Sequence, residues 1–182
     1  MKLTYLLILL TTLSACSSKP AAIKKYYRIE LPVHANTANT HPYTLWIKRP
    51  EAYSILGNRP MVATDNEGAL QQLSHHTWIE SPKILIQEQL QKHLSNQWQT
   101  VTTNRPSDSD YYQLHSSIKA FEKDDNQAHV HMTFKLFAPD LSLLKTLDLS
   151  SMQTLNGDGY AAFASAINAA ISEIFNQLEF TL

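Results

Sequence analysis

Histidine is the residue type in this sequence that offers chemistry beyond packing, and four histidines occur in two close pairs. His129 and His131 stand at i, i+2 in an alternating segment, so both side chains project from one face of a strand. His75 and His76 form the second pair, on another segment. Two imidazoles on one face bind a transition metal when a third ligand converges on them. No carboxylate lies at ligand spacing beside His129 and His131, so we predict no metal site and place this pair on the solvent-facing side of its strand.

Catalytic groups of other kinds are also missing from the sequence. There is no glycine-rich phosphate loop, no nucleophile elbow and no second cysteine for a thiol site. Asp108 with Asp110, and Asp124 with Asp125, are better explained as turn formers than as an acid–base dyad. No set of residues supplies a nucleophile, a base and an orienting group. We therefore predict no catalytic residues, no cofactor and no enzymatic activity.

The single cysteine, Cys16, follows a short apolar segment at the N-terminus. Residues 3–13 are apolar and come after Lys2; the run is too short for a membrane span of ~20 residues but is typical of a secretory signal. Residues 13–16 (LSAC) resemble the bacterial lipobox. A secreted protein with one cysteine cannot form an internal disulfide, and lipid attachment to Cys16 explains the residue. An ordinary signal peptide with a chance cysteine is the alternative.

The sequence is expected to divide at this cysteine. Residues 1–15 form the lipoprotein signal peptide, residues 16–25 hold the lipidated cysteine and a polar tether, and residues 26–182 form a single domain. Several acyl chains on one residue give stable membrane attachment. By resemblance to the sorting rule of enteric lipoproteins, Ser17 directs the protein to the outer membrane. Since 15 basic and 16 acidic side chains nearly balance and no charged run stands out, nucleic acid is not an expected partner.

A long amphipathic helix is predicted directly after Ser81. Ser81 is a suitable N-cap, and Pro82 fits the first helical position, where its missing N–H would have no helical partner anyway. The apolar side chains that recur at four-residue steps and form a core-facing stripe are Ile86, Leu90, Leu94 and Trp98. The sequence therefore predicts a core helix packed on a sheet.

Alternating segments predict the sheet. Residues 26–31, 43–47 and 61–64 are expected to form strands in the first part of the domain. Later segments that alternate and are joined by short turns predict an antiparallel meander over residues 112–120, 128–136 and 144–154. In the first of these, Ile118 and Ala120 are expected on the same face as Tyr112. A second, alanine-rich amphipathic helix is predicted over residues 160–178. The predicted fold class is α+β, a mostly antiparallel sheet with two long amphipathic helices packed on one face.

Several segments together resemble a known family. They are residues 59–62 (RPMV), Trp78-x-Glu80-x-Pro82 before the long helix, residues 26–29 (YYRI) after the lipobox, and residues 159–162 (GYAA) at the entry to the last helix. In order and spacing they resemble the ABC-type transport auxiliary lipoprotein family (PqiC/YmbA-like). The resemblance covers nearly the whole mature chain, although each motif alone is loose.

The resemblance implies a non-catalytic subunit of an MCE-type, Pqi-like intermembrane lipid transport system. Such a subunit would dock a periplasm-spanning MCE-domain protein at the outer membrane, and docking on a ring-shaped MCE assembly would favour a homo-oligomeric ring. Only Cys16 carries over from the family as a modified residue. The alternatives are a lipoprotein enzyme or metal-binding protein that uses the histidine pairs, and a cell-envelope assembly factor of similar α+β shape.

Overall fold

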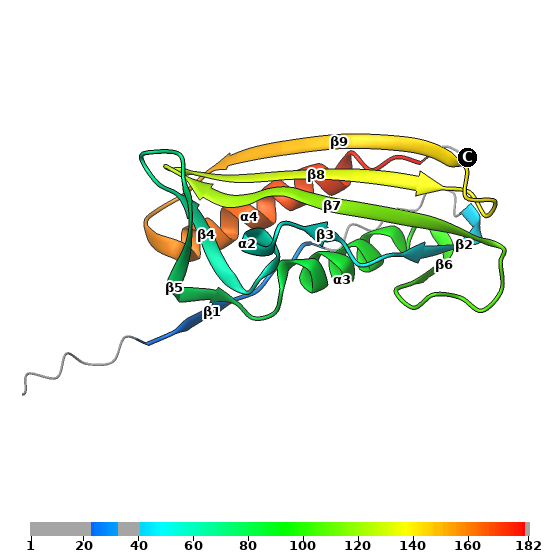
Figure 1. Cartoon of the computed structure of the whole chain (residues 1–182), viewed down its shortest axis with the longest axis horizontal. Helices are drawn as coiled ribbons and strands as arrows, with labels where there is room; N and C mark the ends of the chain where they lie inside the picture. The colour runs from blue at the N-terminus through cyan, green and yellow to red at the C-terminus, as the bar shows by residue number, and fades with distance from the viewer. Residues whose placement is uncertain (1–22, 33–40, 181–182) are drawn as a thin grey trace, which may run out of the picture.

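A mixed sheet forms one layer of the domain (Figure 1). The structure, a computed structural model, describes residues 23–32 and 41–180. Within these residues the strands are β1 (Lys25–Tyr27), β2 (His41–Ile47), β3 (Glu51–Ala52), β4 (Pro60–Thr64), β5 (Leu70–Trp78), β6 (Trp98–Thr102), β7 (Tyr111–Asp124), β8 (Gln127–Phe137) and β9 (Leu143–Thr154). The α+β class is confirmed.

Strand β7 joins the two halves of the sheet. Along one edge it pairs with β8 in antiparallel register, and β8 pairs in the same way with β9, so the predicted meander is confirmed. Along its other edge β7 pairs in parallel with three short strands, β2, β3 and β4. Further parallel pairs join β1 to β5 and β2 to β6. The sheet is therefore mixed: most of its paired residues lie in the antiparallel β4–β5 hairpin and the β7–β8–β9 meander, and short strands from the first part of the chain add parallel pairs.

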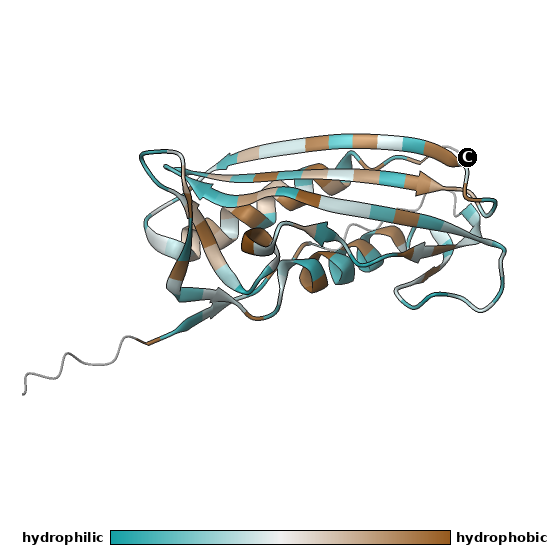
Figure 2. Cartoon of the chain, viewed as in Figure 1, coloured by the Kyte–Doolittle hydropathy of each residue, from teal (hydrophilic) through white to brown (hydrophobic). Residues whose placement is uncertain are grey.

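The inner face of β8 shows the predicted alternation without exception. Its completely buried side chains are Ala128, Val130, Met132, Phe134 and Leu136, and the residues between them are partly or fully exposed. The alternation is visible as bands of opposite colour along β7 and β8 (Figure 2). These side chains belong to the same core cluster as the buried residues of the two long helices.

The helices are the short α2 (Ser54–Gly57) and the longer α3 (Pro82–Leu94) and α4 (Gly159–Asn176). Helix α4 packs against β8 and β9, whereas α3 packs against β2 and β6. They share one hydrophobic core but contact different strands, so their placement on one common face stays a prediction. No helix in the described part of the chain has both the length and the hydropathy to cross a membrane.

Helix α3 begins where the sequence predicts and ends earlier. Ser81 is the N-cap residue, but its hydroxyl donates to the carbonyl of Gly57 at 2.7 Å and does not cap the helix amides. The helix ends at Leu94, and Ser95 occupies the C-cap, where both its N–H and its hydroxyl donate to the Gln91 carbonyl. Trp98 opens β6 instead of continuing the helical stripe, and it is buried there.

Two strand predictions are wrong in detail. In β7, Ile118 pairs with Met132 but Ala120 pairs with His131, so Lys119 is the extra residue of a bulge and the strand changes face. Ala120 therefore lies on the opposite face to Ile118. Near the N-terminus, the predicted strand over residues 26–31 is limited to Lys25–Tyr27. The chain then leaves the sheet and continues between the helices.

Candidate functional site

The histidine pair on β8 lies on the outer face of the meander, as predicted, with partners on both neighbouring strands. His129 Nδ1 is 3.4 Å from a carboxylate oxygen of Glu122 on β7, and its Nε2 is 3.2 Å from the Ser150 hydroxyl on β9. His131 Nε2 is 3.0 Å from a carboxylate oxygen of Asp148 on β9. We call Glu122, His129, His131 and Asp148 the histidine face.

The two carboxylates of the histidine face lie in different environments. Burial raises the pKa of Glu122, against the opposing effects of the hydrogen bond from the Phe121 N–H and of His129. Asp148 is mostly exposed, and hydrogen bonds from Thr133 and then His131 lower its pKa. The buried carboxylate is therefore the harder of the two to ionise.

Sequence reasoning missed both carboxylates. No acid lies near His129 and His131 in the sequence, but Glu122 and Asp148 on the neighbouring strands are brought beside them by the register of β7–β8–β9. The signal that would have found them is the cross-strand register: the β7–β8 register, with its bulge at Lys119, places Glu122, and the β8–β9 register places Asp148.

The second histidine pair does not join the first. His75 and His76 are consecutive on β5, so their side chains point to opposite sides of the strand. His75 is exposed, whereas the His76 ring lies 3.9 Å from the ring of Tyr160 on α4 and its Nδ1 shares a 3.1 Å hydrogen bond with the Tyr27 hydroxyl. Burial, followed by Lys25 and His75, lowers the pKa of His76.

No group of three or more His, Cys, Asp or Glu side chains that could hold a metal ion is found within residues 23–32 and 41–180. Each histidine of β8 has one carboxylate partner on a different strand, which fits two separate polar pairs. Asp124 and Asp125 form the β7–β8 turn, where Asp125 adopts a left-handed φ of 47°, as its role as a turn former predicts. Cys16 lies outside the described residues.

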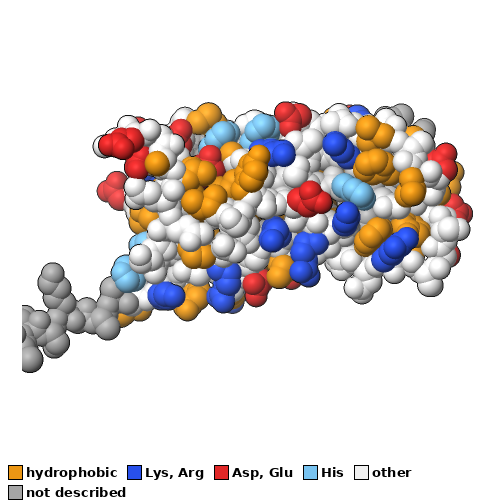
Figure 3. Space-filling view, in the orientation of Figure 1, with side chains coloured by type: hydrophobic (Ala, Val, Ile, Leu, Met, Phe, Trp, Pro, Cys, Tyr) orange, Lys and Arg blue, Asp and Glu red, His pale blue; other side chains and the backbone are white. Residues whose placement is uncertain are grey.

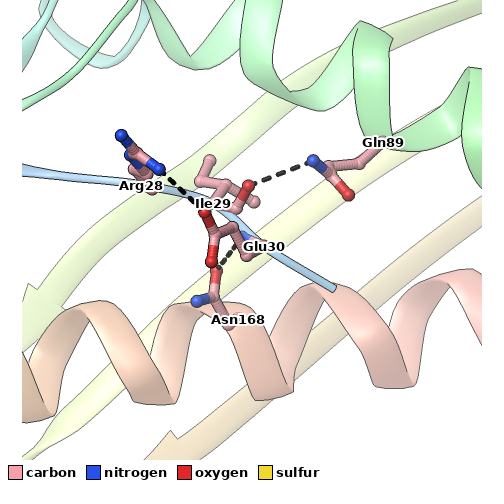
Figure 4. Close-up of polar contacts among 5 residues, drawn as sticks. All are labelled: Arg28, Ile29, Glu30, Gln89 and Asn168. Carbon is pink, nitrogen blue, oxygen red and sulfur yellow. Dashed lines mark hydrogen bonds and ion pairs between the residues drawn. The ribbon is translucent and has the colours of Figure 1, made fainter. Parts of the chain in front are cut away.

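A second notable region is the segment that follows β1. Residues 28–32 pass between α3 and α4, as Figure 4 shows for Ile29 between Gln89 and Asn168. The Ile29 side chain is buried, and its carbonyl accepts a hydrogen bond from Gln89 Nε2 at 3.0 Å. The Glu30 N–H donates to Asn168 Oδ1 at 3.3 Å. The first part of the domain after the predicted tether is thus fixed to both long helices.

Gln89 belongs to a set of three glutamines on α3 that each donate to a backbone carbonyl of another segment. Gln87 donates to Ile47 at 2.8 Å and Gln91 donates to Val101 at 3.2 Å. At 100° per residue, Gln87 and Gln91 share one flank of the helix and Gln89 lies on the other. The helix therefore bonds to β2 and β6 on one side and to residues 28–32 on the other. The alternation Gln-Glu-Gln-Leu-Gln is the sequence signal for these bonds, and its glutamines lie outside the apolar stripe that predicts the helix.

The sequence model of the ABC-type transport auxiliary lipoprotein component family matches residues 27–179. The chain belongs to this family. The ABC-type transport auxiliary lipoproteins are components of transport systems, so membership gives the protein a transport-associated role, a transporter partner and a lipid anchor in a membrane.

Solved structures agree with this assignment at the level of the fold. A Xanthomonas campestris protein of family DUF330 superposes with a TM-score of 0.75 at 18% identity, over 85% of this chain and 92% of that chain. An uncharacterized protein superposes with a TM-score of 0.72 at 16% identity, over 86% of this chain and 96% of that one. No protein of curated function matches the sequence.

Proposed function

We propose that this auxiliary lipoprotein is a non-catalytic subunit of an MCE-type, Pqi-like intermembrane lipid transport system. It is anchored through Cys16 on the periplasmic face of the outer membrane, after removal of residues 1–15 as a signal peptide. From there it docks the distal end of a periplasm-spanning MCE-domain protein. The observation that carries the proposal is the family match over residues 27–179.

Two further observations support it. The lipobox-like residues 13–16 end in the only cysteine, and Ser17 follows it. Residues 17–22 are six residues long and span at most ~20 Å, so a domain anchored at Cys16 stays close to the membrane. Confinement to a surface raises the effective concentration of the docking domain without strong contacts. A ring of copies would match a ring-shaped MCE assembly.

The anchor is tested by Cys16→Ser. Because Cys16 is the only thiol, this substitution is expected to abolish palmitate labelling and to release the protein from the outer-membrane fraction. Ser17→Asp is the matched control: it keeps the thiol and is expected to retain labelling while changing the membrane in which the protein sediments. A Cys16→Ser protein that still labels and sediments with the outer membrane would contradict the anchor.

The partner is tested by cross-linking in cells followed by affinity purification of the tagged lipoprotein. The MCE-domain protein is expected among the cross-linked products of the wild type and to be strongly reduced for Cys16→Ser. Metal analysis of the same purified protein tests the histidine alternative. A stoichiometric transition metal without any MCE cross-link would favour the metal-binding alternative over the docking proposal.

A further inference from the structure

The described chain begins with a group of side chains that point into solvent next to the predicted tether. Ile23 is 82% exposed and Tyr26 is 57% exposed, and Lys24 and Lys25 lie exposed between them. Figure 3 shows hydrophobic and basic side chains together at the end of the domain where the described chain begins. Apolar and aromatic side chains beside lysines are the combination of residues found at membrane interfaces.

A groove of about 450 Å³ lies beside this group. Its polar lining consists of Lys24, Tyr26, Arg59, Gln72, Ser74 and Thr77, and no carboxylate of the described residues lines it. Arg59 is held in the wall of the groove by two contacts. Its guanidinium carbon lies 5.6 Å from the centre of the Tyr26 ring, and its Nε donates to the Trp78 carbonyl at 3.3 Å. The groove combines two cations with neutral donors, which is the composition that recognises a phosphate.

The cations of this end are not neutralised by neighbouring acids. Among the described residues, no carboxylate lies within ion-pair distance of Lys24, Lys25 or Arg59, whereas Arg28 pairs with Glu30 at 3.4 Å. Asp65 and Glu67 lie in the turn of the same β4–β5 hairpin whose strands line the groove, but they do not line the groove themselves. The groove, together with the adjacent Lys25, therefore presents positive charge to solvent.

The predicted tether is short enough to keep this end of the domain near the membrane. Six residues lie between Cys16 and Ile23, so the two are seven residue steps and at most ~25 Å apart. A lipid anchor at Cys16 would hold this exposed apolar and basic group at the level of the headgroups. At such a distance weak contacts are made repeatedly, because the tether supplies a high effective concentration.

We propose that residues 23–26 and Arg59 form a membrane-contact site whose groove takes the phosphate of an anionic phospholipid headgroup. The site rests on the proposed anchor at Cys16 and adds to it an orientation of the domain. Ile23 and Tyr26 enter the interface, and Lys24 and Arg59 bind the headgroup phosphate. The lipid anchor holds the protein at the membrane, and the contact site fixes which end of the domain points at it.

The test uses the full lipidated protein in vesicles with brominated acyl chains. Tyr26→Trp places a fluorophore in the contact site, and Tyr43→Trp, 42% exposed on β2 at the other end of the domain, is the matched control (Figure 1). After subtraction of the parent signal, Tyr26→Trp is expected to be quenched, and about twofold more strongly in phosphatidylglycerol-containing vesicles than in pure phosphatidylcholine. Tyr43→Trp is expected to stay unquenched in both.

Charge variants in the Tyr26→Trp background sharpen the result. Lys24→Gln with Arg59→Gln is expected to remove the dependence on phosphatidylglycerol, whereas Arg59→Lys retains it. Vesicle flotation and palmitate labelling report on the anchor separately. A protein that floats while Tyr26→Trp shows no more quenching than Tyr43→Trp overturns the contact site and leaves the anchor standing. Equal quenching on both vesicle types overturns the headgroup assignment, and loss of flotation overturns the anchor and the contact site together.

Discussion

Helix α3 and the histidine face both carry polar side chains at ordered positions, but they use them in opposite ways. Gln87 and Gln89 are buried, neutral and bonded to backbone carbonyls of other segments. His131 and Asp148 are titratable, partly or mostly exposed, and bonded to each other across two strands. The first region uses polar groups to complete the interior, and the second uses them to cover an outer surface.

The difference follows from what replaces each interaction when it is lost. A buried carbonyl that loses its donor has no water to replace it, so the full desolvation penalty remains. An exposed pair that is lost is replaced by hydrogen bonds to water, and its contribution is small. Stability should therefore depend strongly on α3 and weakly on the histidine face.

The largest expected effect is at the apolar centre of α3. Leu90 is completely buried in the core, so Leu90→Ala is expected to lower the free energy of unfolding by about 2–5 kcal/mol. Lys92 is exposed two residues later, and Lys92→Ala is expected to change the free energy of unfolding by no more than ~0.5 kcal/mol. Urea denaturation of residues 17–182 measures both. Equal effects would mean that α3 does not bury the face described.

The next effect concerns the buried amides. Gln89→Ala leaves the Ile29 carbonyl without its donor and is expected to lower the free energy of unfolding by roughly 1–3 kcal/mol. Glu88→Ala, at an exposed position of the same helix, is the control. Faster amide exchange in residues 28–32 of Gln89→Ala would locate the loss. Unchanged stability would place the Ile29 carbonyl in contact with water.

The same contrast explains how much the sequence alone could predict. The completely buried residues of β8, from Ala128 to Leu136, follow from alternation, because a strand covered on one face must bury every second side chain. The start of α3 at Pro82 follows from local chemistry. Both signals are local, and both predictions are confirmed.

Long-range features could not be predicted in this way. The parallel pairing of β2, β3 and β4 with β7 depends on where distant segments meet, and no local period encodes it. The bulge at Lys119 shifts the register by one residue, which moves Ala120 to the outer face and sets Glu122 beside His129. The acidic partners of the histidines therefore appear only once the register is known.

Glu122 lies between the two cases, because it belongs to the histidine face but is buried like the glutamines of α3. Burial raises its folded-state pKa above the unfolded value of 4.5, so ionisation opposes folding as the pH rises through and above that value. Glu122→Gln removes this penalty and keeps an acceptor for the Phe121 N–H. We expect the variant and the wild type to be similarly stable at about pH 4 and the variant to be the more stable at about pH 8.

Urea denaturation at the two pH values tests this prediction. Asp148→Asn is the matched control, because the pKa of Asp148 is lowered and its ionised form stabilises the fold above its unfolded pKa. This control is therefore expected to shift stability in the opposite direction, by a small amount because Asp148 is mostly exposed. A wild type that remains the more stable at about pH 8 would show that the pairing of Glu122 with His129 outweighs burial.

The smallest expected effect is the loss of His75, His129 or His131, one at a time. His131→Ala removes one partly exposed hydrogen bond to Asp148, and the Thr133 hydroxyl still donates to Asp148 at 2.6 Å. The free energy of unfolding is therefore expected to change by no more than ~0.5 kcal/mol. If the protein docks a partner through a surface, His75→Ala and His129→Ala are likewise expected to leave detergent resistance of the envelope intact. Detergent sensitivity and cross-linking to the MCE-domain protein are measured on the same strains.

His76→Ala separates a structural role from a functional one. Its ring packs on Tyr160 of α4 and bonds Tyr27, so this substitution is expected to lower stability more than the other three histidine variants without changing the cross-link. His76→Phe keeps an aromatic ring on Tyr160 and is expected to recover part of the loss. A histidine variant that folds, keeps its anchor and its cross-link, and still loses envelope function would refute the docking proposal, because a surface that docks a partner has no need of a titrating group.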